Sequence, residues 1–143
     1  MTFLWSDAWL LQAIALASRA RPATLAEVLA AAEAVNHALP TDDELHGALS
    51  RLTGACYVSE IDQTFRLTER VPAETADAIA DSGWSEGRRA ASRLLDAEPW
   101  SHERNVGDPR NSVRYPGLTS ERICSADKEY RRQVSRSRRR ATE

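Results

Sequence analysis

Two repeated helix-start signals constrain this chain more than any other feature. Thr24 is followed three residues later by Glu27, and Thr41 is followed at the same spacing by Glu44. Each pair fits a capping box, in which the threonine and glutamate side chains satisfy unpaired backbone N–H groups at a helix N-terminus. Apolar residues at helical spacing follow both pairs. The sequence therefore predicts two successive amphipathic helices, the second over residues 41–53.

One further helix and a hairpin flank this pair. Apolar residues at helical spacing predict a first helix over residues 7–18, with Asp7 favouring its N-terminus. After the second capped helix the apolar period changes from 3.6 to two. Residues 57–61 and 64–68 therefore predict two short strands joined by a tight turn at Asp62-Gln63.

The order helix, helix, helix, hairpin resembles the winged-helix superfamily, in the form seen in small bacterial regulators. The resemblance covers residues 7–70, and its motifs are the helix 41–53, Leu49-Ser-Arg-Leu52, Tyr57-Val58 and Phe65-Arg-Leu-Thr68. It implies a mainly α fold with a small β-hairpin. It also implies a third helix of the kind that DNA-binding members press into the major groove. Winged helices bind either DNA or protein, so the resemblance predicts fold better than activity.

The rest of the chain is expected to form appendages. The predicted segments are a winged-helix-like domain over residues 1–70, appended helices broken at Ser82-Gly83 over 71–98, a loop over 99–118, and a C-terminal helix over 119–143 that ends in a basic, partly disordered tail. The loop contains Trp100, Val106, Val113 and Tyr115, which we expect to hold it against the domain surface.

Composition excludes several classes of protein. Of the 143 residues, 42% are hydrophobic and 28% are charged, which is ordinary for a globular domain. No apolar run is long enough to span a membrane, and the N-terminus lacks the features of a signal peptide. Cys56 and Cys124 are isolated, and we interpret them as free thiols. These features predict a cytoplasmic protein.

The sequence offers no catalytic constellation. It contains no phosphate-binding glycine loop, hydrolase motif or metalloprotease motif. His37, His46 and His102 fit no triad, and Asp42 with His46 is too small a set for zinc, which needs three or four ligands. Cys56 is expected to be buried at a helix exit. We therefore expect no enzyme, no metal and no cofactor.

Charge is divided unevenly along the chain. Residues 1–100 hold 8 Lys/Arg against 15 Asp/Glu, a net charge of −7, and residues 101–143 hold 11 against 6, a net charge of +5. The first turn of the third helix is Asp42-Asp43-Glu44, and its later exposed positions are expected to be His46, Gly47, Ser50 and Arg51. Phosphates would be repelled from that turn, so the sequence disfavours DNA binding by this face.

Two functional hypotheses follow. The first is a non-catalytic module that binds a protein partner or forms a homodimer, through a face containing Asp42, Asp43, His46 and Arg51. Trp5, Trp9 and Trp84 either cover the domain's own core or contribute to such a dimer. The alternative is a DNA-binding transcriptional regulator, with contacts from Arg51, Arg66, Arg70, Arg131, Arg132, Arg136, Arg138, Arg139 and Arg140. The C-terminal arginines either bind phosphates, pair with the acidic body or are simply solvated.

Overall fold

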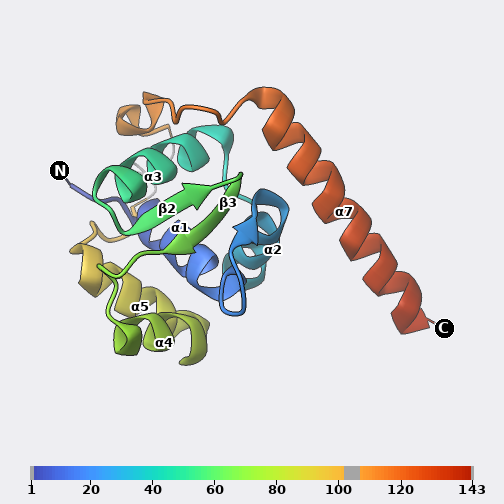
Figure 1. Cartoon of the computed structure of the whole chain (residues 1–143), viewed down its shortest axis with the longest axis horizontal. Helices are drawn as coiled ribbons and strands as arrows, with labels where there is room; N and C mark the ends of the chain where they lie inside the picture. Colours follow the sequence, from blue (N-terminus) through green and yellow to red (C-terminus); the bar gives the residue numbers. More distant parts are fainter. Residues whose placement is uncertain (1, 102–106, 143) are drawn as a thin grey trace.

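The chain folds into a mainly helical body with a small antiparallel sheet and one projecting helix (Figure 1). The structure is a computed structural model and describes residues 2–101 and 107–142. Its elements are α1 (Trp5–Ala17), β1 (Ala23–Thr24), α2 (Leu25–Asn36), α3 (Asp42–Gly54), β2 (Val58–Ile61), β3 (Thr64–Leu67), α4 (Ala73–Asp81), α5 (Trp84–Leu95), the 3-10 helix η1 (Pro109–Ser112) and α7 (Ser120–Thr142). The predicted order of three helices and a hairpin is confirmed.

Both predicted capping boxes are present. The Thr24 hydroxyl accepts the backbone N–H of Glu27 at 3.2 Å, and the Glu27 carboxylate accepts the N–H of Thr24 at 3.0 Å. Thr41 and Glu44 exchange the same two hydrogen bonds at 3.1 and 2.9 Å. The sequence therefore fixes the starting points of α2 and α3 locally.

Helix α1 is the centre of the body and not a surface helix. The residues from Ser6 to Ala15 are buried on every side. Helices α2, α3, α4 and α5 and strand β3 all contact α1, so this helix is buried on all sides, including its polar residues Asp7 and Gln12. Its Trp9 is 2% exposed and donates its indole N–H to the Ala32 carbonyl at 2.9 Å.

The sheet has one strand more than the predicted hairpin. Its order is β1-β3-β2, and β1 pairs antiparallel with β3 through Ala23 opposite Phe65. A two-residue strand carries no recognisable period, so the sequence pattern could not reveal β1. The turn is where it was predicted, and Asp62 and Gln63 both have positive φ, at 51° and 63°.

Helices α4 and α5 share the core of the three-helix unit. The chain breaks between them at Ser82-Gly83 as predicted, and both helices contact α1. At their closest approach, a Cβ on Gly87 would lie 2.2 Å from the Ile79 carbonyl oxygen. One apolar cluster continues from the N-terminal helices through α5 into the start of α7 at Ile123.

The C-terminal tail is helical, which corrects the expectation of a frayed end. Helix α7 continues through all the arginines to Thr142 and stands away from the body at its C-terminal end (Figure 1). Arginine has high helix propensity, and cations in the last turn interact favourably with the helix dipole. His102 and Val106 lie outside the described residues. No helix in the described ranges combines the length and apolarity needed to cross a membrane.

Candidate functional site

The chain covers the predicted binding face of α3 with its own C-terminal half. We call residues 107–119 the strap; they contain η1, which packs against α3, and they lead into α7 (Figure 1). The expected exposure of His46, Gly47 and Arg51 is therefore wrong, since all three are buried, His46 at 9% and Arg51 at 8% exposed. Local periodicity predicted the helix, but a segment 60 residues further along the chain buries its outer side.

Arg51 forms the buried centre of this contact. Its Nε and Nη2 donate to the two carboxylate oxygens of Asp7 at 2.7 and 3.0 Å, and the Asp7 side chain is fully buried. The same guanidinium donates to the Arg110 carbonyl at 2.9 Å and to Asn111 Oδ1 at 2.5 Å. Asp7 also accepts the N–H of Leu4 at 2.8 Å, so it supports the start of α1 as predicted. Arg51 therefore joins α1, α3 and the strap and is not exposed for a partner.

His46 and Gly47 complete the docking of the strap on α3. His46 Nδ1 accepts the backbone N–H of Tyr115 at 3.0 Å. Burial, together with the nearby Arg114 charge, lowers the pKa of His46 below its ordinary value, although Asp42 and Asp43 oppose the shift. A Cβ on Gly47 would lie 2.0 Å from Asn111 Oδ1, so only glycine allows this close approach.

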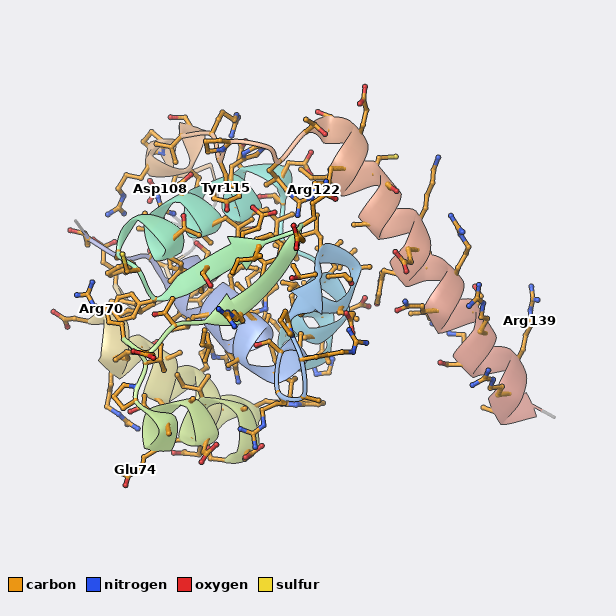
Figure 2. All side chains as sticks on the ribbon, viewed as in Figure 1. Arg70, Glu74, Asp108, Tyr115, Arg122 and Arg139 are labelled. Carbon is orange, nitrogen blue, oxygen red and sulfur yellow. The ribbon has the colours of Figure 1, made fainter. Side chains whose placement is uncertain are left out.

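Two carboxylates, one on α3 and one in the hairpin, are paired with arginines. Asp43 accepts from Arg114 of the strap at 2.8 Å, whereas Asp42 is exposed. In the hairpin, Glu60 accepts the Tyr115 hydroxyl at 2.6 Å and pairs with Arg122 of α7 at 2.7 Å. Figure 2 shows Tyr115 and Arg122 side by side above the hairpin.

The cluster formed by Glu60, Tyr115 and Arg122 is shielded from water. Both side chains of the Glu60–Arg122 pair are less than one-fifth exposed, and Arg122 also lies over the Phe65 ring, 5.5 Å from its centroid. Burial and the hydrogen bond to Glu60 raise the pKa of Tyr115 above its ordinary value. These contacts fix the end of the strap and the first turn of α7 on the body.

The two hairpin arginines named as possible DNA contacts lie apart from the strap. Arg66 is exposed on β3, directly across the sheet from Ser59. Arg70 is exposed and already engaged, because its guanidinium lies 4.5 Å from the centroid of the Tyr57 ring and donates to the Ala55 carbonyl. These two arginines are therefore separate positive charges and do not form a cluster.

Helix α7 has two opposite faces. Ile123 and Ala126 are buried against the body, and Tyr130 and Val134 continue the same stripe half-buried. With 100° between successive residues, this inner stripe spans an arc of about 80°. The opposite side is the arginine face, which consists of Arg131, Arg132, Arg136, Arg138, Arg139 and Arg140 and spans an arc of about 200°.

The arginine face is exposed and strongly cationic. All six of its arginines are exposed, and the ten residues from 131 to 140 include no Asp or Glu. Arg131 pairs with Asp127 one turn earlier at 2.9 Å. Within the described residues, Arg132, Arg136, Arg138 and Arg140 form no ion pair. Figure 2 shows the labelled Arg139 pointing away from the body.

The docking of the strap on α3 was not predicted from the sequence, whereas the basic C-terminal segment was. Asn111, Arg114, Tyr115 and Arg122 were not singled out as a group, because their partners on α3 and β2 are distant in sequence. Gly47, inside a helix and on its outer side, was the one available signal of a close approach. Cys56, expected to be buried, is exposed, and both cysteines are free thiols as predicted.

The described residues bring no three His, Cys, Asp or Glu side chains together as metal ligands. Comparisons with models of protein families, with curated proteins and with solved structures find no match to this chain. What the chain binds has to be inferred from its own residues.

Proposed function

We propose that this chain is a non-catalytic winged-helix module that binds the phosphate backbone of nucleic acid through the arginine face of α7. Support for the winged helix comes from the element order, in which three helices precede a hairpin and β1 extends the sheet on the other side of β3. The binding surface proposed here differs from the one that the resemblance implies.

The observation that carries the proposal is the arginine face itself. Six exposed arginines in ten residues form a dense positive surface with no acidic residue among them. Each guanidinium can donate two parallel hydrogen bonds to a phosphate, which makes arginine better suited than lysine to backbone contacts. Counterion release upon phosphate contact supplies most of the affinity of such a surface.

The face of α3 is a poorer candidate for any partner. The strap lies across it, Arg51 and His46 are buried beneath the strap, and Asp43 is paired with Arg114. A duplex or a protein docking on α3 would have to displace the strap and leave the buried Asp7–Arg51 pair partly solvated. Asp42 remains exposed and negative, which repels phosphates further.

The test is binding to random-sequence duplex DNA at two salt concentrations. If four to six phosphates are contacted, affinity should fall about 150- to 2000-fold between about 50 mM and about 200 mM salt. Replacing Arg132, Arg136 and Arg138 with glutamine should remove about three contacts and lower affinity on the order of 100-fold at the lower salt.

A matched control has the same net charge but changes arginines elsewhere. Arg66, Arg89 and Arg93 are exposed on β3 and α5, and their replacement with glutamine should leave affinity within about twofold. An equal loss in both triple variants would mean that only net charge matters. Absence of a complex at the lower salt with the unaltered chain would rule out the proposed function.

A further inference from the structure

We infer that the arginine face recognises the major groove of duplex DNA as a folded helix, and that the bound duplex stabilises the helix over residues 131–142. This inference rests on the proposed function and adds the form of the nucleic acid and the conformation that binds it. It follows from the arrangement of the arginines around α7 and from their mutual repulsion.

The arginines are distributed over two edges and a centre. Arg131 and Arg138 lie on one edge of the face, and Arg136 and Arg140 lie on the other, about 140–200° away around the helix. Arg132 lies between them. A single strand or a flat anionic surface meets one side of a helix, so it would leave one edge without phosphates. A groove with a phosphate wall on each side can engage both edges together.

Helix dimensions favour the major groove of B-form DNA. An α-helix with its side chains is about 10–12 Å wide, and that groove is about 12 Å wide. The major groove of A-form RNA is too narrow and deep for side chains to read. The C-terminal half of α7 also stands clear of the other elements, so it can enter a groove without a collision between the duplex and the body (Figure 1).

Without an anion, the helix over residues 131–140 is only weakly stabilised. Arg132 and Arg136, and likewise Arg136 and Arg140, are four residues apart and repel each other across successive turns. The inner stripe provides few compensating contacts there, because beyond Val134 the residues of α7 whose side chains the structure describes, 135–141, are all exposed. Short helices without tertiary contacts are marginal in water. Phosphates on both sides would neutralise the repulsion and stabilise the helix.

The experiment compares two variants that keep every arginine. Ser137 lies outside the arc that the arginine face occupies. Ser137→Pro therefore breaks the helix without placing the proline ring in the groove. Ser137→Ala is the matched control that keeps the helix. Duplex DNA should bind the proline variant at least about 10-fold more weakly than the alanine variant, since ordering of the arginines is lost. Circular dichroism should show a gain of helix on addition of duplex DNA for the alanine variant and not for the proline variant.

Single-stranded DNA and double-stranded RNA of the same length complete the test. Both should bind the unaltered chain more weakly than duplex DNA, and both should discriminate little between the two variants. Equal binding of duplex DNA by the proline and alanine variants, or equal affinity of the unaltered chain for all three nucleic acids, would overturn the inference and leave the proposed function standing. Loss of all binding at about 50 mM salt in the unaltered chain and both variants would instead reject the proposed function.

Discussion

At the scale of single residues, the decisive feature is that Arg51 is an internal side chain. It pairs with the fully buried Asp7 and holds Asn111 and the Arg110 carbonyl of the strap. An arginine on the outer side of a presumed DNA-reading helix would ordinarily be assigned to the nucleic acid. Here its hydrogen-bonding capacity is already used within the chain, so its contribution is to stability.

Removal of Arg51 should therefore destabilise the protein strongly. Arg51→Met leaves the Asp7 carboxylate buried without its partner, which should lower the free energy of unfolding by about 3–5 kcal/mol in urea denaturation. Arg93→Met removes an exposed arginine of α5 and should change it by less than about 0.5 kcal/mol. The double variant Asp7→Asn, Arg51→Met should lose less free energy of unfolding than Arg51→Met alone, because no unpaired carboxylate remains buried. A loss below about 1 kcal/mol in the single variant would contradict the buried-pair interpretation.

His46 should make the stability of the strap depend on pH. Its folded-state pKa lies below the ordinary value, so the unfolded chain binds the proton more readily than the native one. The stabilisation is therefore fully present above about pH 6.5 and is lost as pH falls through the lower folded-state pKa. Protonated Nδ1 can no longer accept the Tyr115 N–H.

The measurement is urea unfolding at about pH 7.5 and about pH 5 for the unaltered chain and for His46→Asn. Asparagine offers an acceptor oxygen at nearly the same place but does not titrate in this range. On acidification, the free energy of unfolding of the unaltered chain should fall by about 1 kcal/mol more than that of the variant. This difference is the net contribution of about one hydrogen bond. Identical losses would show that His46 does not sense pH in this site.

At the scale of elements, the contact between α3 and the strap is the least expected feature of the fold. The capping box of α3 was predicted correctly, whereas the segment predicted as a loop over 99–118 contains the 3-10 helix η1. The association of α3 with the strap depends on Gly47, which lets Asn111 lie where any larger residue would place a Cβ. The strap thus covers the outer side of α3 and positions the first turn of α7.

Two glycines of the same helix provide a direct test of this contact. Gly54→Ala meets no atom within 4 Å and should be neutral or stabilising by up to about 1 kcal/mol, because alanine favours helix. Gly47→Ala should instead destabilise by about 1–3 kcal/mol, because its methyl group collides with Asn111 and Arg51. Thermal unfolding of both variants checks this. Stabilisation by both substitutions would mean that the strap does not pack on α3 in solution.

At the scale of the whole molecule, charge is separated between the body and one helix. The first 100 residues carry a net charge of −7, and the six arginines of the arginine face lie together on the far side of α7 from the body. An acidic body repels a duplex and a cationic helix attracts it, so the field of the whole protein should orient an approaching DNA toward the arginine face. The first half of α7 anchors this helix through Ile123, Ala126 and Arg122.

The sequence alone determined the elements that depend on nearby residues. The capping boxes at Thr24 and Thr41, the turn at Asp62-Gln63 and the break at Ser82-Gly83 are local, because each depends on residues within a few positions. The six arginines were also visible in the sequence as a basic segment, although their arrangement on one face of a continuous helix was not predicted.

Tertiary structure alone decided which surfaces remain exposed. Arg51 and His46 became internal because the strap, 60 to 70 residues further along, folds back on α3, and no local pattern encodes a pairing over that distance. The same folding paired Asp43 and Glu60 with arginines and left the arginine face opposite the buried stripe of α7. Periodicity specifies which side of a helix is apolar, but whether its polar side meets water depends on the rest of the chain.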